Sequence, residues 1–210
     1  MKTSIKTLFA TALTLVVLTS SAFAAETPKE SNFTVLTQVK NISKIEVKGN
    51  VEIILVQAPT ESVKVYDSYY AKNALVQQQE GVLRISSFQK ETLTVAVYVR
   101  NLSSIEASDN ATVKTYGKID FLSLDIILKD NATANINTTT VNLYTSVKDN
   151  ASLKLSGSTT EHYALLGAQA KLSMDQFVAA SSSVNTVAPV YAKVAATVQT
   201  LDTVLIADEL

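Results

Sequence analysis

Apolar and polar residues alternate with a period of two through most of the chain after residue 40. This alternation is typical of β-strands that bury one face, and β-branched residues and Thr dominate the alternating stretches. The stretch 70–80, rich in Ala, Leu and Gln, is compatible with a short helix or with an irregular loop. The pattern predicts an all-β fold. Its first apolar positions, on both sides of a turn at Gly49-Asn50, are Ile45, Val47, Val51, Ile53 and Leu55.

A turn sequence recurs about every twenty residues in the second half of the chain, most clearly over 108–190. Successive turn Asn residues are 21 and 19 positions apart. Each turn precedes a short strand, a polar break and a second short strand. Such a period is typical of a β-solenoid, whose stacked coils share one core. An up-and-down meander is the alternative, but it would not need the same dipeptide at every corner. The copies are Ser108-Asp109-Asn110-Ala111-Thr112, Lys129-Asp130-Asn131-Ala132-Thr133 and Lys148-Asp149-Asn150-Ala151-Ser152, with a weaker copy from Gly167 to Lys171.

The Asp-Asn turns have both a structural and a chemical interpretation. Asn tolerates the left-handed conformation of tight corners, and stacked amides can hydrogen-bond, so a structural ladder of Asn110, Asn131 and Asn150 is predicted. The preceding Asp109, Asp130 and Asp149 would form a column of carboxylates. Calcium takes oxygen ligands, so this column is a candidate calcium site. Lys129 and Lys148 lie beside this column and would neutralise it, which argues against a metal site.

The start of the chain, 1–24, has the pattern of a secretory signal. Lys2 and Lys6 precede an apolar stretch, and Ala22-Phe23-Ala24 predicts cleavage before Ala25. The apolar run is shorter than the roughly 20 residues that a membrane span needs. We therefore expect a signal peptide at 1–24, a flexible segment at 25–34 and one β-solenoid domain at 35–210.

The composition of the remaining chain, 25–210, limits the partners. Without Lys2 and Lys6, 16 Lys and Arg face 19 Asp and Glu, a net charge of −3, so nothing favours nucleic acid or anionic lipid. No later stretch is apolar enough for a membrane span. The chain has no Cys, hence neither a disulfide framework nor the residue that lipid anchoring modifies. We expect export to the periplasm, the outer cell surface or the medium.

Candidate catalytic residues are few. The single histidine, His162, lies beside Glu161 in a polar segment and is predicted to be an ordinary surface residue. Without a second His, a Cys or a nucleophile motif, a His-based triad or metal site is unsupported. Paired carboxylates can hydrolyse glycosides, but the Asp column is too regular for two groups of different pKa. We predict no catalysis and no cofactor, with a polysaccharide-active enzyme as an alternative.

The densest aromatic cluster is Tyr66, Tyr69 and Tyr70, a candidate partner surface because tyrosines are enriched where proteins recognise partners. Packing of a loop against the core is the other interpretation. The partner would be a protein or glycan at the cell surface. An apolar stretch at 194–206 would cap the end of the solenoid, which favours a monomer over an end-to-end dimer.

A characteristic order of strands and turns is present in 45–57, Val63-Lys64-Val65, Gly81-Val82-Leu83-Arg84-Ile85, Val95-Ala96-Val97-Tyr98-Val99 and Leu102-Ser103-Ser104-Ile105-Glu106-Ala107. This order resembles the head GIN domain family, the auto-transporter adhesins of Bacteroidetes-type bacteria. The similarity covers about residues 35–200. It implies an exported all-β protein with stacked strands, and adhesion or envelope binding as the function, with a structural envelope scaffold as the alternative. The family favours Ser-Gly turns, whereas this chain uses Asp-Asn.

Overall fold

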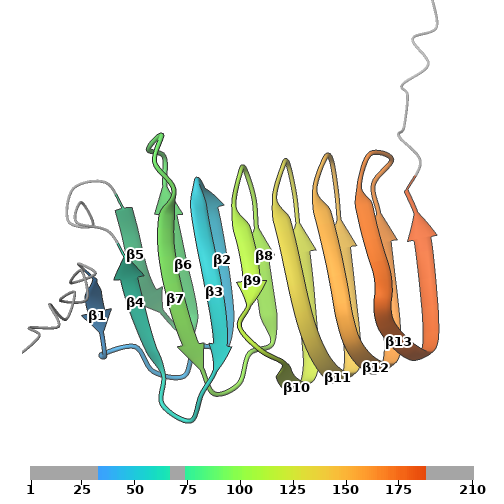
Figure 1. Ribbon diagram of the computed structural model, residues 1–210, viewed down its shortest axis with the longest axis horizontal. Helices are drawn as coiled ribbons and strands as arrows, with labels where there is room; N and C mark the ends of the chain where they lie inside the picture. Colours follow the sequence, from blue (N-terminus) through green and yellow to red (C-terminus); the bar gives the residue numbers. More distant parts are fainter. Residues whose placement is uncertain (1–32, 67–73, 188–210) are drawn as a thin grey trace, which may run out of the picture. The chain divides into compact units, whose positions relative to one another are not determined.

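The computed structural model describes residues 33–66 and 74–187, and every regular element among them is a β-strand. No helix that could cross a membrane occurs in this part of the chain. The strands form one curled, 13-stranded sheet (Figure 1), which confirms the prediction of an all-β fold. They are β1 Thr34–Leu36, β2 Lys44–Gly49, β3 Val51–Gln57, β4 Ser62–Tyr66, β5 Ala74–Gln79, β6 Val82–Ser87, β7 Leu93–Val99, β8 Ser104–Ala107, β9 Thr112–Thr115, β10 Ile119–Leu128, β11 Thr133–Val147, β12 Ser152–Leu166 and β13 Lys171–Thr186.

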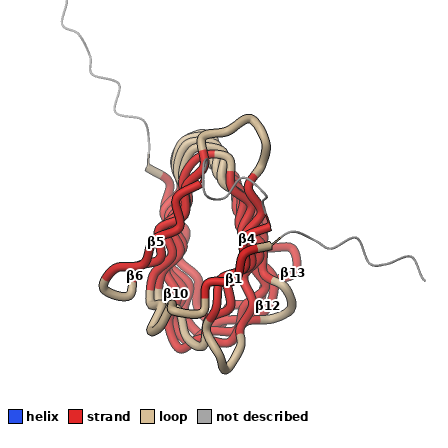
Figure 2. Tube along the Cα trace, turned by 90° about the vertical axis from the view of Figure 1, so that its left-hand side faces the viewer, coloured by secondary structure: helices blue, strands red, loops and turns tan. Residues whose placement is uncertain are grey.

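The sheet curls so that its two halves face each other, and we call these halves the two walls. The longest strands run through both walls. The first part of β11 pairs with β9, and the later part pairs with β10. One wall continues from β9 through β3, β7, β4 and β1, and the other from β10 through β8, β2, β6 and β5. Figure 2 shows both walls and the curved end where the long strands pass from one wall to the other.

Most neighbouring strands are parallel. Thr133 of β11 pairs with Ser152 of β12, and Ser152 pairs with Lys171 of β13, so paired residues are one sequence repeat apart. The register between β12 and β13 shifts at an irregularity beside Lys154. After it, paired residues of the two strands lie one position further apart along the chain, as do Tyr163 and Ser183. Among the described strands, antiparallel pairs occur only in β1–β4–β7 and β5–β6. An up-and-down meander would instead make its neighbours antiparallel.

The core lies between the two walls. Apolar residues of the alternating pattern point inward from both walls, while their polar neighbours lie on the outer faces. Complete burial of one Val, Leu or Ile side chain stabilises the fold by about 1.5–3 kcal/mol, so this shared core carries much of the stability. The predicted core positions Ile45, Val47, Val51, Ile53 and Leu55 are all buried.

The polar breaks expected between two short strands are absent from the later repeats. β11 and β12 each continue through 15 residues and bend at the corner between the walls. Thr138 and Thr140 are buried there, and their hydroxyls donate to the Ile119 carbonyl at 3.3 Å and to Thr159 Oγ1 at 2.9 Å. The buried hydroxyl groups of both threonines are therefore hydrogen-bonded, so the strand accommodates these polar residues without interruption.

The stretch 70–80, expected to be a helix or a loop, contains a strand instead. Its described part, Ala74–Gln79, is β5 and pairs with β6. Glu80 and Gly81 join the two strands, both with positive φ (51° and 78°), as in a two-residue hairpin turn. The helix propensity of Ala and Gln is a weak preference, and the hairpin pairing overrides it.

The Asp-Asn turns have their left-handed residue at the Asp. Backbone φ is 59°, 58° and 54° at Asp109, Asp130 and Asp149, so the assignment of this conformation to the Asn is wrong. A short polar side chain allows Asp to adopt it. The asparagine ladder remains a prediction, with one contact of 3.5 Å between Asn131 Nδ2 and Asn110 Oδ1.

The carboxylates link each turn to the turn before it. Asp130 Oδ2 accepts the backbone N–H of Asp109 at 3.0 Å, and Asp149 Oδ2 accepts that of Asp130 at 3.2 Å. Asp109 Oδ2 accepts the N–H of Gly49 at 3.1 Å. The repeated Asp therefore supplies both the turn conformation and a bridge between neighbouring turns.

We expect Asp130→Ala to lower the free energy of unfolding by about 1–2 kcal/mol, because it removes this acceptor and places Ala in a left-handed conformation. Asp130→Asn keeps a side-chain oxygen, so it should lower the free energy of unfolding by less than Asp130→Ala does. Asn131→Ala is the matched control, since its amide makes only the 3.5 Å contact. Urea unfolding measures all three variants. An Asn131→Ala loss as large as that of Asp130→Ala would contradict this role.

Candidate functional site

A shallow trough of about 450 Å³ crosses the outer face of β10, β11, β12 and β13. Outward side chains line it in two rows, one residue from each strand in each row. Neighbouring strands are about 4.8 Å apart, so the three steps from β10 to β13 make the trough roughly 14 Å long. We call this surface the tyrosine trough; its rows are Ser123, Asn142, Glu161 and Ser181, and Asp125, Tyr144, Tyr163 and Ser183.

Two tyrosine rings occupy the middle of the trough. Tyr144 and Tyr163 are paired across β11 and β12, and their rings stack with centroids 5.9 Å apart and an interplanar angle of 11°. Tyr163 is 44% exposed. The next residues in the row are Asp125 beside Tyr144 and Ser183 beside Tyr163, which are shorter than a tyrosine. The two outer faces of the stacked pair are therefore not covered by a further ring of this row.

The charged groups of the trough are both carboxylates, which accept hydrogen bonds. Asp125 and Glu161 take part in none of the ion pairs among the described residues. No Lys or Arg lines the trough, which therefore carries two negative charges. Asn142 adds an amide, and the serines and tyrosines add hydroxyl groups, which both donate and accept hydrogen bonds.

His162 lies beneath the trough and is buried, so the prediction of a surface histidine is wrong. It is 3% exposed, and its ring contacts Phe177 edge-on at 5.6 Å between centroids. Nε2 is 3.0 Å from Thr145 Oγ1, and Nδ1 is 3.1 Å from Ser182 Oγ. Burial lowers the pKa of His162 below its ordinary value of 6.5. Both partners are hydroxyls, so the histidine lacks the carboxylate that orients the base of a catalytic triad.

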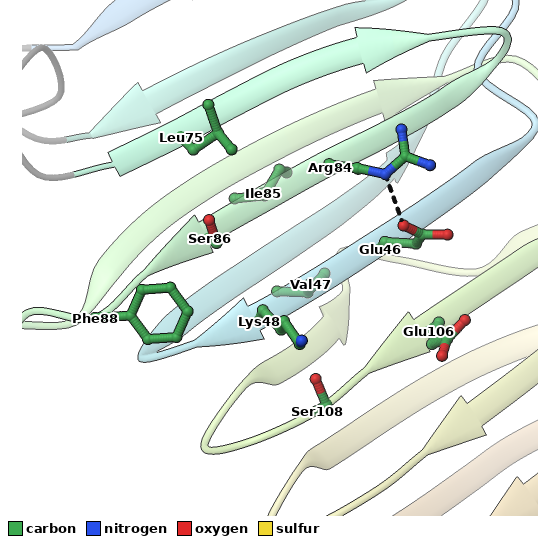
Figure 3. A pocket seen from close by; sticks show the side chains of 10 residues that line it. All are labelled: Glu46, Val47, Lys48, Leu75, Arg84, Ile85, Ser86, Phe88, Glu106 and Ser108. Atoms are coloured by element: carbon green, nitrogen blue, oxygen red, sulfur yellow. Dashed lines mark hydrogen bonds and ion pairs between the residues drawn. The ribbon is translucent and has the colours of Figure 1, made fainter.

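A second concave surface, of about 480 Å³, lies over β2, β5, β6 and β8 (Figure 3). We call it the arginine groove; its side chains include Glu46, Lys48, Leu75, Arg84, Phe88 and Glu106. Leu75 and Phe88 are exposed. Arg84 Nε lies 2.9 Å from Glu46 Oε2, the dashed contact in Figure 3, so these two charges neutralise each other.

An ion-pair chain continues from this groove across the neighbouring strands. Lys44 Nζ contacts Glu46 at 2.8 Å and Glu106 at 3.0 Å, and Lys129 Nζ contacts Glu106 at 2.8 Å. Hydrogen bonds from Lys129 and Lys44 lower the pKa of Glu106, and one from Lys44 lowers the pKa of Glu46. Lys129 therefore pairs with Glu106 rather than with the Asp column, contrary to expectation. Exposed pairs of this kind contribute about 0–1 kcal/mol each.

The predicted carboxylate column has a structural explanation. One oxygen each of Asp109, Asp130 and Asp149 accepts a backbone N–H. Within 33–66 and 74–187, no group of three or more His, Cys, Asp or Glu residues is arranged to hold a metal ion. These hydrogen bonds to the backbone give the aspartates of the column a structural role.

The predicted tyrosine cluster is only partly described. Tyr66 packs its ring 5.6 Å from that of Phe33, whereas Tyr69 and Tyr70 lie outside the described residues. The sequence analysis missed Tyr144 and Tyr163. Their spacing along the chain equals that between Asn131 and Asn150, so aligning the repeats would have placed the two tyrosines side by side.

Comparison with solved structures finds the same fold in proteins of low sequence identity. A putative adhesin from Bacteroides fragilis has a TM-score of 0.60 at 15% identity, over 75% of this chain and 77% of that one. A putative adhesin from Parabacteroides distasonis has a TM-score of 0.58 at 13% identity, over 75% and 78%. A "putative lipid binding protein" from the same species has a TM-score of 0.58 at 8% identity, over 74% and 78%. No curated protein matches the sequence.

A family model identifies the chain more directly than these structural similarities do. The match covers residues 41–203, which include most of the described strands, both concave surfaces and the repeated turns. It also agrees with the resemblance carried by residues 45–57 and the strands that follow them. The chain belongs to the family described as "Putative auto-transporter adhesin, head GIN domain".

Proposed function

We propose that the curled sheet is a β-solenoid whose coils are the repeats present in the sequence. Parallel pairing at the repeat spacing supports the assignment, as do the Asp carboxylates that bridge neighbouring turns. β9 and β10 make one coil of two strands. In the following coils, β11, β12 and β13 are each a single long strand bent at the corner.

The protein acts as an exported, non-catalytic adhesion module that binds its ligand along the tyrosine trough. The trough supports this proposal because it combines two aromatic rings with carboxylates that have no ion-pair partner among the described residues. Both lie on a face formed by parallel strands. Tyrosine is enriched at recognition sites, since one end of its side chain is apolar and the other forms hydrogen bonds. The adhesin family and the signal pattern of residues 1–24 support a position outside the inner membrane.

The tyrosine trough is a better recognition site than the arginine groove. In the groove, Arg84 is paired with Glu46, and Glu106 is paired with two lysines. A ligand would have to compete with these contacts. In the trough, Asp125 and Glu161 have no cationic partner among the described residues, so a ligand gains their hydrogen bonds without breaking an ion pair.

The absence of catalysis is part of this proposal. A general base must reach the proton that it removes. His162 is enclosed, and its two ring nitrogens are engaged by Thr145 and Ser182. The carboxylates best placed to meet a ligand are those of the trough, where their role is to accept hydrogen bonds.

The first test is the location of the protein on cells that produce it. Antibodies raised against the protein should label intact cells as strongly as permeabilised cells. Labelling only after permeabilisation would overturn adhesion and favour an envelope scaffold. A cytoplasmic protein serves as the control for intact membranes.

The second test is whether the trough mediates attachment. Cells that produce a Tyr144→Ser, Tyr163→Ser double variant should attach much less than wild-type cells to the surface that wild-type cells colonise. The comparison is made at equal antibody labelling. Tyr116→Ser is the matched control, because Tyr116 is an exposed tyrosine outside the trough. Equal attachment of the double variant and the control would remove the trough from the proposed function.

A further inference from the structure

We infer that the tyrosine trough binds a neutral glycan chain, an inference that rests on the adhesion function proposed above. The ligand class follows from three properties of the trough: two stacked rings flanked in their row by shorter side chains, carboxylates without cationic partners among the described residues, and donors and acceptors repeated at the strand spacing. Each property excludes a different class of ligand.

The stacked rings select a flat ligand surface with C–H groups. Tyr144 and Tyr163 are nearly parallel, and their row places Asp125 and Ser183 on either side of the pair. Each outer ring face is therefore flanked in this row by a side chain shorter than a tyrosine. The face of an aromatic ring is electron-rich, so it attracts the weakly positive C–H groups on the face of a sugar ring. A sugar placed over Ser183 or Asp125 would continue the tyrosine stack.

The polar groups match the hydroxyls of a sugar. Asp125 and Glu161 accept hydrogen bonds, and Asn142 both accepts and donates them. Ser123 and Ser181 add hydroxyls at the two ends of the row. A sugar hydroxyl donates one hydrogen bond and accepts others, so it can use both kinds of group. A simple cation would use only the acceptors and leave the amide donor of Asn142 without a ligand partner.

The charge of the trough excludes acidic polymers. Two carboxylates line it without a Lys or Arg among the lining residues. A sulfated, phosphorylated or uronic-acid polymer would bring further negative charges close to them, and like charges at such distances repel. The glycan must therefore carry no negative charge where it contacts the trough.

The pairing of the strands argues against an extended peptide. Peptides that add to a sheet use free backbone groups at its edge. The trough lies on the face of the sheet, and β11 and β12, which carry the tyrosines, are each paired on both sides. Recognition in the trough must therefore come from side chains, which repeat at about 4.8 Å and suit a ligand made of repeated units.

The test is binding of the purified protein to immobilised neutral oligosaccharides: chains of mannose, galactose, glucose and N-acetylglucosamine. At least one should bind, and Tyr163→Ser should weaken it about tenfold or more, the size expected for a lost aromatic contact. Tyr163→Phe keeps the ring and should retain most of the affinity. Asp125→Asn tests the acceptor, and Tyr116→Ser is the control that should bind like the wild type. Circular dichroism confirms that each variant is folded.

Two further probes distinguish the alternatives. A sulfated polysaccharide and a lysine-rich peptide are immobilised in the same way. Binding of either with the same dependence on Tyr163, and of no neutral chain, would overturn the glycan assignment. Neutral-chain binding that is unchanged in Tyr163→Ser would also overturn it. If the tyrosine variants abolish attachment of cells but no neutral chain binds, the adhesion function stands and only the ligand class fails.

Discussion

Gly157→Ala should lower the free energy of unfolding by more than about 3 kcal/mol, because the backbone at this position leaves no space for a side chain. Gly157 lies in β12 with φ of 100°, where it pairs with Thr138 of β11. A β-carbon at this position would lie 2.0 Å from the Thr138 carbonyl oxygen. Since that oxygen belongs to the backbone of the neighbouring strand, relief requires the two strands to separate. In a domain of this size, the melting temperature should fall by about 10 °C.

Gly117→Ala is the matched control for this prediction. Gly117 also has a positive φ, 77°, but a β-carbon there would meet no atom within 4 Å. The control therefore isolates the cost of the left-handed conformation, about 1 kcal/mol. Thermal and urea unfolding followed by circular dichroism measure both variants. A similar loss in the two would show that the close contact at Gly157 relaxes without cost.

His162→Ala should destabilise the protein by about 3 kcal/mol at pH 8, because it leaves a cavity and an unpaired buried hydroxyl. The cavity lies beside Phe177, and the hydroxyl is that of Thr145. His162→Gln retains a polar side chain that has both a donor and an acceptor, so this variant should lose less stability. Urea unfolding at pH 8, where histidine is neutral in both states, measures these effects without a contribution from titration. A loss below about 1 kcal/mol for His162→Ala would show that the site collapses around the smaller residue.

The same histidine should make stability depend on pH. Its pKa is lowered in the folded protein, so below pH 6.5 the unfolded chain binds a proton more readily than the folded one. The stability that neutral His162 contributes is fully present above pH 6.5. It is lost as the pH drops from 6.5 towards the lowered pKa of His162. The ring contacts Thr145, Ser182 and Phe177, none of which carries a charge that could offset the burial.

His162→Gln provides the control for this pH dependence, because Gln does not titrate. The wild type should lose stability between pH 7 and pH 5, whereas the variant should not. The lowered pKa values of Glu46 and Glu106 act in a lower window: their contribution is present above about pH 4.5 and is lost as the pH falls further. An identical slope for both proteins between pH 7 and pH 5 would exclude His162 as its source.

The alternating pattern predicted most strands and core positions correctly. Ile45, Val47 and Ile53 are buried because alternation along one strand decides which side chains share a face, and this property is local to the sequence. The same alternation also indicates the burial of His162. His162 lies between Glu161 and Tyr163, and both neighbours face outward, so alternation places the histidine on the buried face.

The candidate site was harder to predict than the fold. Tyr144 and Tyr163 are one sequence repeat apart in the chain and become neighbours only through the register of β11 and β12. Sequence density instead favoured Tyr66, Tyr69 and Tyr70, which are close along the chain. A recognition surface on stacked strands draws one residue from each strand, so clustering along the sequence is a poor guide to it.

Local sequence patterns were enough to predict most of the strands, the buried face of most of them and the positions of the repeated turns. Period-two alternation and turn residues act within a few positions, so they can be recognised without knowing the partner strand. Three features could be seen only in the folded protein: Ala74–Gln79 is a strand, the turn Asp bridges to the preceding turn, and two tyrosines stack on the outer face. These features depend on pairing between residues far apart in the chain. That pairing is set by the register of whole strands and the packing of both walls, which no local stretch specifies.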